Sequence, residues 1–257
     1  MTAGSAAAPE LLTIIVAAYN ERATVRAVID RLVAIDLPVA REILIVDDGS
    51  TDGTGDVLAS AVRDNLPITV IGGEPNRGKG YAIRRGLARA RGSIVAIQDA
   101  DLELDPQQLA ALIAPILNGE TDVVYGSRFL AGGAAAAPWI TVAANRVLTA
   151  VTNVLYGAAL TDMETCYKIM RTGVARSLEL SADRFDIEPE ITARLLRHGH
   201  RIHEVPVRFD PRSRAQGKKI GWRDGLRALQ VLVVERVRRG SEYQPAAGRG
   251  QRVGGRE

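Results

Sequence analysis

The chain has very little of the chemistry that builds cross-links or clustered metal sites. It contains one cysteine, Cys166, and three histidines in 257 residues. A single cysteine excludes an intrachain disulfide and a zinc site made of several cysteines, and it fits a reducing compartment. The histidines form the pattern His198-x-His200-x-x-His203. Gly199 between them favours a turn from a helix to a strand over a set of metal ligands.

Long apolar runs are also absent. No stretch approaches the ~20 residues that a membrane-spanning helix needs. Residues 1–9 are rich in alanine but have neither a basic region nor a long apolar core, so we expect a flexible N-terminus and no signal peptide. These absences predict a protein that is made in the cytosol and stays there, with peripheral attachment to the inner face of the cell membrane where lipid substrates require it.

Charge is balanced overall but unevenly placed. The formal net charge is +3, and 46% of the residues are hydrophobic, which is ample for a core. Arginines concentrate near the C-terminus while acidic residues become sparse: Arg236, Arg238, Arg239, Arg249, Arg252 and Arg256. We expect a disordered basic tail over 239–257, either solvated or in contact with an acidic surface; basic tails of this kind bind anionic lipid or nucleic acid, and no nucleic-acid partner is expected here.

Short apolar runs alternate with helical patterns in the first half of the chain. Strands are predicted over 11–17, 43–46, 68–71, 94–98 and 122–125, and helices over about 22–35, 52–63 and 78–91, with another beginning near Pro106. Asn20 is the expected cap of the first helix. The alternation predicts an α/β fold with a mostly parallel central sheet and helices on both faces.

The second half is less regular. Helices are predicted over 140–156, 185–197 and 222–238, a strand over 202–209, a small-residue loop over 131–138 and a basic loop over 211–219. In the last helix, Leu226, Leu229, Val233 and Val237 share one side. The helix over 140–156 is amphipathic and is expected either to pack against the sheet or to lie on a membrane surface.

Acidic residues follow two of the apolar strands directly. Asp99-Ala100-Asp101 comes after 94–98, and residues i and i+2 of an extended segment point the same way. Two such carboxylates, with Glu103 two residues further on, are typical ligands for Mg²⁺ or Mn²⁺ beside a diphosphate. The alternative is a surface turn before Pro106. Ligands of open α/β sheets gather at the edge formed by the carboxyl ends of the strands, which favours the metal site over the turn.

The other acidic cluster is 47–52, Asp-Asp-Gly-Ser-Thr-Asp. Ser50 or Asp52 can cap the next helix, which leaves Asp47 or Asp48 to accept hydrogen bonds from a base or a ribose. After the first strand, residues 17–21 supply an aromatic ring and polar groups for a nucleoside. Asn76-Arg77-Gly78-Lys79-Gly80 opens a helix, where Lys79 adds a positive charge for an anion; an ordinary solvated turn is the alternative.

Taken together these segments resemble family 2 glycosyltransferases of the GT-A fold. The segments are Ala-Tyr-Asn-Glu (18–21), Val-Asp-Asp-Gly-Ser-Thr-Asp (46–52), Asn-Arg-Gly-Lys-Gly (76–80), Gln-Asp-Ala-Asp-Leu-Glu (98–103) and Gly-Ser-Arg-Phe (126–129). Within that family the chain is most similar to the dolichyl-phosphate mannosyltransferase branch, which makes polyprenyl-phosphate sugars. The resemblance covers about 10–235 and implies one glycosyltransferase domain over 10–238. The branch usually has proline at the position of Ala17.

The resemblance also implies roles for individual residues. Tyr19, Asn20, Glu21 and Asp48 resemble nucleoside contacts beside Ala17, whereas Asp99, Ala100 and Asp101 form the metal and diphosphate motif, with Glu103 close by. Ser127 and Arg128 look like part of an acceptor-phosphate pocket. Residues 161–168, which include Asp162, take the place of an acceptor-side loop. Arg212 and Lys218 belong to a basic loop that resembles a segment folding over the phosphates.

The implied reaction is a metal-dependent, inverting transfer of a hexosyl unit from GDP-mannose or a UDP-hexose to a polyprenyl phosphate. A lipid phosphate is largely deprotonated at pH 7, since its second pKa is about 6, and needs no general base. A hydroxyl acceptor would need one, with Asp162 or Glu164 as candidates. Asp101, Arg128 and Asp162 are the expected catalytic residues. The rival hypotheses are transfer to a sugar hydroxyl and a non-catalytic nucleotide-binding protein at the membrane.

Overall fold

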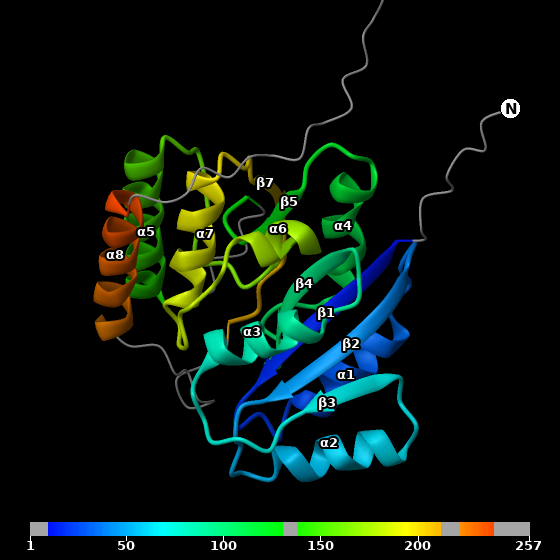
Figure 1. Cartoon of the computed structure of the whole chain (residues 1–257). Helices are drawn as coiled ribbons and strands as arrows, with labels where there is room; N and C mark the ends of the chain where they lie inside the picture. Colours follow the sequence, from blue (N-terminus) through cyan, green and yellow to red (C-terminus); the bar gives the residue numbers. More distant parts are fainter. Residues whose placement is uncertain (1–9, 131–137, 212–221, 239–257) are drawn as a thin grey trace, which may run out of the picture.

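The computed structural model describes residues 10–130, 138–211 and 222–238 (Figure 1). The expected flexible N-terminus, most of the small-residue loop, most of the basic loop and the basic tail lie outside these residues. No helix within the described ranges combines the length and apolar content needed to cross a membrane.

A seven-stranded sheet forms the centre of the molecule, in the order β3-β2-β1-β4-β6-β5-β7. The strands are β1 (Leu11–Ala18), β2 (Ala40–Asp47), β3 (Ile68–Ile71), β4 (Ile94–Asp99), β5 (Val123–Ser127), β6 (Lys168–Arg171) and β7 (His203–Pro206). Every pairing is parallel except those of β6, which runs antiparallel to both β4 and β5. The prediction of a mostly parallel sheet is therefore confirmed.

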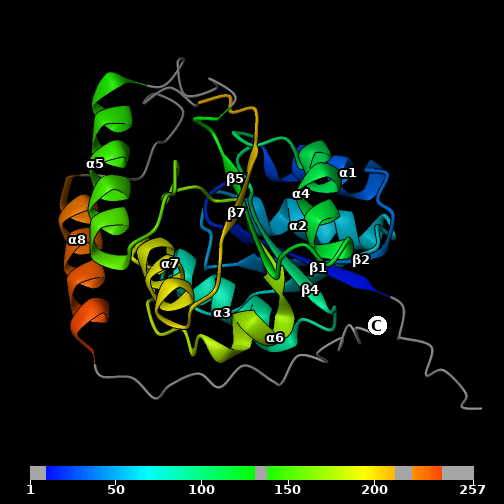
Figure 2. The ribbon, with the colours of Figure 1, turned by 90° about the horizontal axis from the view of Figure 1, so that it is seen from above.

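Helices cover both faces of this sheet. They are α1 (Val25–Ala34), α2 (Thr54–Arg63), α3 (Lys79–Arg89), α4 (Leu109–Leu117), α5 (Trp139–Tyr156), α6 (Thr172–Ser177), α7 (Ile187–Arg197) and α8 (Trp222–Val237), with a short 3₁₀ helix at Pro106–Gln108. Figure 2 shows α1, α2 and α4 on one side of the strands and α3, α6 and α7 on the other. The pair α5 and α8 lies furthest from the strands, packed on α7.

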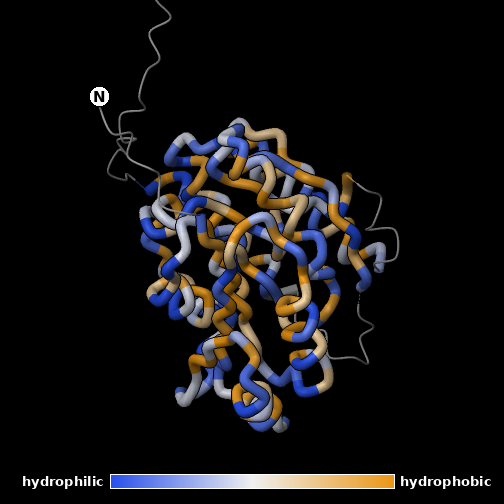
Figure 3. The backbone as a smooth tube through the Cα atoms, turned by 90° about the vertical axis from the view of Figure 1, so that its right-hand side faces the viewer, coloured by the Kyte–Doolittle hydropathy of each residue, from blue (hydrophilic) through white to orange (hydrophobic). Residues whose placement is uncertain are grey.

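The core follows from the residue types of the strands. Strands buried on both faces read as continuous Val, Ile and Leu runs, and Ile14, Ile15 and Val16 of β1 are all buried. Successive side chains point to opposite faces, so each strand packs against helices on both sides. The helices are amphipathic instead, and along them the tube of Figure 3 alternates between orange and blue.

Two of the expected helix caps are wrong. The first helix begins at Val25, after Thr24, and Asn20 lies before it in the left-handed region at φ 53. The Asn20 side chain accepts the Thr51 N–H at 2.8 Å instead, which joins two loops. The second helix is preceded by Gly53, whereas Asp52 accepts the Thr54 N–H within its own turn. Short polar side chains can cap a helix or accept a hydrogen bond within a loop, and the sequence pattern does not distinguish these two roles.

The four-residue strand β6 and the helix α6 after it are not anticipated by the sequence pattern. β6 begins with Lys168, a residue expected in a loop, yet its side chain is fully buried. A strand of four residues that begins with a charged residue is too short to show the alternation of apolar and polar residues that identifies a strand. Its pairing with β4 and β5 supplies the hydrogen bonds that place it in the sheet.

Gly86 of α3 is expected to be irreplaceable for packing. A Cβ there would lie 2.4 Å from Ile15 Cγ2, and Ile15 is buried in the sheet. Gly86→Ala should therefore destabilise the protein by about 1–3 kcal/mol, measured by urea unfolding. In the control Gly173→Ala, a Cβ on α6 meets nothing within 4 Å, so stability should stay equal or rise by about 0.5–1 kcal/mol. Equal losses in both variants would contradict this packing argument.

Candidate active site at the carboxyl edge of the sheet

Strand register brings the predicted site segments together. Ala17 of β1 lies opposite Asp99 of β4, and Ala18 lies opposite Asp47 of β2. The three strands are parallel, so their carboxyl ends meet at the same edge of the sheet. The segments that follow these strands, around residues 19–22, 48–53 and 100–103, therefore lie side by side.

Each of these strand exits uses a backbone conformation in the left-handed region. The residues are Asn20 at φ 53, Gly49 at φ 73 and Leu102 at φ 63. A Cβ on Gly49 would lie 2.6 Å from the Asn76 nitrogen, so only glycine fits there. For Leu102 this conformation costs on the order of 1–2 kcal/mol. Strain of this kind gathers at functional sites, where the surrounding structure enforces it.

Hydrogen bonds join the first two exits into one unit. The backbone N–H of Asn20 donates to Ser50 Oγ at 2.9 Å, and the N–H of Glu21 donates to Thr54 Oγ1 at 2.9 Å. Glu21 itself is buried, with a carboxylate oxygen accepting from Thr24 Oγ1 at 3.0 Å. Tyr19 is partly buried next to it. The polar groups expected around a nucleoside are thus held in place by their neighbours.

The carboxylate of Asp48 is engaged by the loop before α3. It accepts hydrogen bonds from Asn76 Nδ2 at 2.6 Å, the Arg77 N–H at 3.0 Å and the Gly78 N–H at 2.6 Å. Burial raises the pKa of this carboxyl, although the backbone N–H groups of Arg77 and Gly78 oppose the rise. Asp48 therefore fixes the loop that leads into α3 and places Lys79.

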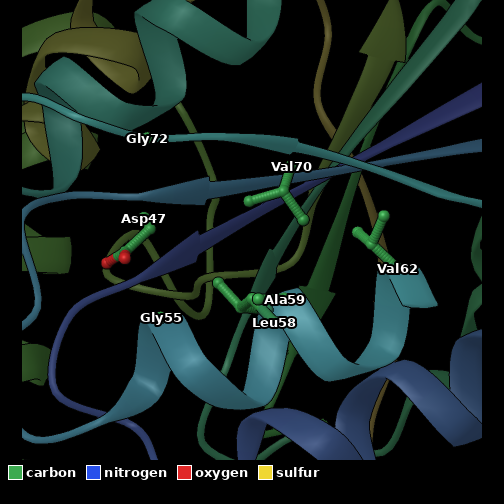
Figure 4. Close-up of a pocket in the computed structure, with 7 residues that line it drawn as sticks. All are labelled: Asp47, Gly55, Leu58, Ala59, Val62, Val70 and Gly72. Carbon is green, nitrogen blue, oxygen red and sulfur yellow. The ribbon is translucent and has the colours of Figure 1, made fainter. Parts of the chain in front are cut away.

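Asp47 is the acidic residue of this pair that borders a cavity. The cavity measures about 380 Å³ and lies between α2 and the β3 side of the sheet. In Figure 4 its lining is mostly apolar and Asp47 stands near Gly55. One oxygen of Asp47, Oδ1, accepts the Ser50 N–H at 3.0 Å. The cavity sits beside the strand exits, on the side of β2.

The Asp99-Ala100-Asp101 motif is a strand end followed by a turn. β4 stops at Asp99, and Ala100 is buried while its carbonyl accepts from Thr24 Oγ1 at 2.7 Å. Asp101 lies in the turn, where its Oδ1 accepts the Glu103 N–H at 3.1 Å. The expectation that the two aspartates share one extended segment is wrong, because the chain turns after Asp99 and passes through left-handed Leu102.

Lys79 connects this strand end to the helix behind it. Its ammonium group lies 2.8 Å from Asp99 Oδ1 and 2.8 Å from Glu188 Oε1 of α7. Burial acts against the charge, but these two carboxylates outweigh it and hold the pKa of Lys79 well above its usual value. Lys79 therefore remains charged and neutralises Asp99.

A second buried lysine continues the network. Lys168 Nζ lies 2.5 Å from Glu188 Oε2 and donates to the carbonyl oxygens of Met163, at 3.1 Å, and Thr165. Both carboxylate oxygens of Glu188 are thus engaged by lysines. The sequence analysis missed Glu188 and placed Lys168 in the loop over 161–168 without a role of its own; two charges inside otherwise buried elements were the available signal.

The expected metal ligands fit a divalent ion only in part. Within the described ranges, no three His, Cys, Asp or Glu side chains gather in a geometry that would hold a metal. Asp99 and Asp101 provide oxygen ligands of the kind that Mg²⁺ and Mn²⁺ accept. An ion at this edge would take its remaining ligands from a bound diphosphate and water, which is how Mg²⁺ usually binds phosphates.

Arg128, at the exit of β5, forms a bidentate ion pair. Arg128 Nε lies 2.7 Å from Asp162 Oδ2, Nη2 lies 2.8 Å from Oδ1, and the Arg128 backbone N–H also donates to Oδ2 at 3.1 Å. Asp162 is fully buried, whereas the side chain of Arg128 keeps 17% of its surface exposed. This arrangement holds the guanidinium in a fixed, mostly buried position with Asp162 as its anchor.

Ser127 and Glu204 hold the loop that contains Asp162. Ser127 Oγ lies 2.6 Å from Thr161 Oγ1, and Glu204 of β7 accepts the backbone N–H groups of Thr161, at 2.8 Å, and Asp162, at 2.9 Å. The loop over 161–163 is therefore tied to two strands. The sequence analysis did not single out Glu204, since a lone glutamate in a short strand carries no distinguishing pattern.

Glu164 lies in the same loop and has a different environment. Its Oε1 is buried and has no hydrogen-bond partner among the described residues. Burial raises the pKa of Glu164 to about 7, with Lys168 opposing the rise. The carboxyl group is therefore close to half-protonated at neutral pH. The two remaining predicted residues, Arg212 and Lys218, lie outside the described residues.

The strand order, the helices on both faces and the acidic residues at the strand exits define a GT-A nucleotide-sugar transferase fold. The chain belongs to glycosyl transferase family 2, whose family model matches residues 13–178, and it is a glycosyltransferase. The resemblance seen in the sequence is thereby confirmed.

Individual relatives extend over most of the chain. Polyprenol monophosphomannose synthase of Mycolicibacterium smegmatis is 29% identical over 230 residues, which cover 86% of this chain and 85% of that protein. Undecaprenyl-phosphate mannosyltransferase of Micrococcus luteus is 31% identical over 229 residues, covering 84% and 90%. Glucosyl-3-phosphoglycerate synthase from Mycobacterium tuberculosis, solved with Mn²⁺, UDP and glucosyl-3-phosphoglycerate, shares the fold with a TM-score of 0.67 at 21% identity, covering 89% and 80%.

Glu164 should make stability depend on pH. Its pKa is about 7 in the folded protein against an ordinary 4.5, so the folded state holds a proton that the unfolded state has released between these pH values. Stability is therefore lost as pH rises from about 4.5 to 7 and stays low above. Glu164→Gln, which cannot ionise, should gain on the order of 1–3 kcal/mol relative to the natural protein between pH 5 and pH 8.

Urea unfolding at the two pH values measures this difference. Glu120→Gln, at an exposed turn after α4, removes a negative charge without burial and serves as the control. A Glu164→Gln effect of the same size at both pH values would contradict the protonated carboxyl.

Proposed function

We propose that this glycosyltransferase moves a hexosyl unit from a nucleotide-diphosphate sugar, GDP-mannose or a UDP-hexose, to a polyprenyl phosphate, with inversion at the anomeric carbon. The observation that carries the proposal is the guanidinium of Arg128, whose side chain keeps 17% of its surface exposed and is anchored bidentately by a fully buried carboxylate. An anion is the natural partner of such a fixed arginine.

The donor diphosphate belongs at the exits of β1, β2 and β4. The nucleoside lies by Tyr19, Glu21 and the Asp47–Asp48 pair, and the diphosphate lies by Lys79 and Asp99. Asp99 and Asp101 would hold a Mg²⁺ or Mn²⁺ ion, which would neutralise negative charge on the diphosphate leaving group. Lys79 adds a positive charge beside the same group, at the start of α3, where the helix dipole also favours an anion.

The acceptor phosphate belongs beside Ser127 and Arg128. One of its oxygens attacks the anomeric carbon and forms the new C–O bond, while the bond from that carbon to the diphosphate oxygen breaks and the electron pair leaves with the nucleoside diphosphate. Two anions must approach each other for this step. Arg128 offsets their repulsion on the acceptor side, and it needs no rearrangement because Asp162 already holds it in place.

The relatives support a lipid acceptor. One is a polyprenol monophosphomannose synthase and the other an undecaprenyl-phosphate mannosyltransferase, and both match over most of this chain. The solved structure with Mn²⁺ and UDP supports a divalent ion beside the diphosphate.

The outer helices supply a surface suited to lipid. On α5 the exposed side carries Trp139, Val147 and Val154, the last with 85% of its surface exposed. On α8, Leu226, Val233 and Val237 are exposed, whereas Ala228 and Leu232 pack inward. Of the apolar residues that share one side of this helix in the sequence, Leu229 is partly buried and the other three are exposed, and exposed arginines lie beside them at 227, 236 and 238. Apolar side chains rimmed by arginine are typical of interfacial helices.

A sugar hydroxyl is the second candidate acceptor. Glu164, with a pKa of about 7, is suited to the general base that such an acceptor requires. Asp162 is less suited, because Arg128 and Asn145 engage both of its oxygens. The synthase that shares this fold was solved with glucosyl-3-phosphoglycerate, a glucosylated compound without a lipid chain, so a lipid is not the only acceptor to be tested.

A donor screen tests the proposed reaction. The purified protein is incubated with Mg²⁺ or Mn²⁺, a short polyprenyl phosphate and a panel of GDP- and UDP-sugars, and lipid products are identified by mass spectrometry. We expect a polyprenyl-phosphate hexose from one donor, and a loss of at least about 100-fold in rate for Asp101→Asn, since charge stabilisation of the leaving group disappears. Glu120→Gln is the control; transfer only to hydroxyl acceptors would overturn the proposal.

Membrane binding should depend on the exposed side of α5. The double variant Val147→Glu/Val154→Glu should bind vesicles containing anionic phospholipid about tenfold or more weakly in a co-sedimentation assay, because each change removes apolar contact and adds a repelled charge. Val62→Glu alters an exposed valine on α2, far from α5 in Figure 1, and should leave binding unchanged. Equal losses in both variants would contradict a lipid surface on α5.

A further inference from the structure

The side of α5 that faces inward carries polar groups. Asn145 and Thr149, one helical turn apart, are both buried, with 8% and 5% of their surfaces exposed. A buried amide and hydroxyl on a packing face cost free energy unless they are hydrogen-bonded. Their presence therefore requires specific partners inside the protein.

Those partners all lie in the acceptor-side loop or on α5 itself. Asn145 Nδ2 donates to Asp162 Oδ1 at 2.9 Å, Thr149 Oγ1 donates to Asn145 Oδ1 at 3.0 Å, and the Met163 backbone N–H donates to Thr149 Oγ1 at 3.2 Å. The contacts form a closed chain from α5 through the loop and back. The amide of Asn145 is thus fixed at both ends.

Asp162 passes this constraint to the arginine. The oxygen that accepts from Asn145, Oδ1, also accepts from Arg128 Nη2 at 2.8 Å, while Oδ2 accepts from Arg128 Nε at 2.7 Å. A carboxylate oxygen has two lone pairs, so Asn145 and Arg128 together saturate Oδ1 in the plane of the carboxylate. With Asn145 in place, the carboxylate has one orientation, and the guanidinium that pairs with it bidentately has one as well.

We propose that Asn145 is a positioning residue for the transfer reaction: acting through Asp162, it sets the direction in which Arg128 presents its guanidinium to the acceptor phosphate. The inference rests on the proposed function, because it takes that phosphate to be the ligand of Arg128. It also joins two features of α5, since the helix whose outer side is suited to lipid holds the arginine from its inner side.

Loss of the Asn145 hydrogen bond should weaken the reaction with the acceptor and leave binding of the donor unchanged. A misplacement of a reacting group by about 1 Å costs up to about 100-fold in rate. Loss of the Asn145 hydrogen bond leaves Oδ1 of Asp162 with Arg128 Nη2 as its donor, while Oδ2 keeps the Arg128 Nε and backbone N–H, so the carboxylate can pivot about Oδ2 and the guanidinium moves with Oδ1. The donor side, built around Lys79 and Asp99, keeps all of its contacts.

The test is Asn145→Leu, which preserves approximate volume and removes the donor. We expect kcat/KM for a short polyprenyl phosphate to fall by about 10- to 100-fold, with the KM for the nucleotide sugar unchanged within about twofold. Thr152→Val is the matched control, because Thr152 is buried on the same helix and its hydroxyl bonds only to the Leu148 carbonyl, at 2.9 Å, among the contacts of the described residues. It should leave both parameters unchanged.

A double-mutant cycle distinguishes a positioning role of Asn145 from a general contribution to stability. If Asn145 acts through Asp162, then Asn145→Leu should cause less than about a twofold further loss in an Asp162→Asn background. Should Asn145→Leu fail to fold, Thr149→Val interrupts the same chain at its next link and should give a smaller loss of the same acceptor-selective kind.

The results separate this inference from the proposed function. If the natural protein glycosylates the lipid phosphate but Asn145→Leu weakens the donor and acceptor parameters equally, or Thr152→Val gives the same loss, the positioning role is overturned and the function stands. Losses that multiply in the double variant overturn it too. If the natural protein transfers no sugar to any polyprenyl phosphate, both proposals fall.

Discussion

The contact of Lys79 with two carboxylates is the interaction on which the site depends. Its ammonium group bridges Asp99 at the end of β4 and Glu188 of α7, and Glu188 pairs in turn with Lys168 of β6. A buried charge is tolerated only with a partner, and removing one member of such a network costs on the order of 3–5 kcal/mol. Two lysines and two carboxylates balance here, so a polar cluster persists inside an apolar core.

This network also determines how the two halves of the site face each other. The ammonium group of Lys168 donates to the carbonyl groups of Met163 and Thr165, and so fixes the loop in which Asp162 pairs with Arg128 at the exit of β5. The network therefore connects the end of β4 with the loop that anchors Arg128. The proposed reaction brings two anions together, and the positive charges nearest its two sides are Lys79 at the start of α3 and Arg128 at the exit of β5, each held by carboxylates.

Much of this arrangement was predictable from the sequence, and the exceptions have a common cause. The strands, most helices and the clustering of the segments around Asp47, Lys79 and Asp99 follow from local periodicity and from the rule for parallel sheets. The inward role of Asp48, the turn after Asp99 and the partners of Glu188 do not follow. Each depends on where a side chain points at a strand end, and on pairing between residues far apart in the chain.

Asn145 illustrates the difference. In the sequence it is an interruption in an amphipathic helix, whereas in the structure it is a hydrogen-bond donor to the acceptor-side loop. The sequence by itself determined the α/β architecture, the family and the edge of the sheet at which the acidic strand exits gather, because apolar periodicity and short motifs act locally. Only the tertiary structure decided which charges are paired and which side of α8 stays exposed. Both depend on packing between residues far apart in the chain, which removes some polar groups from water and leaves others in contact with it.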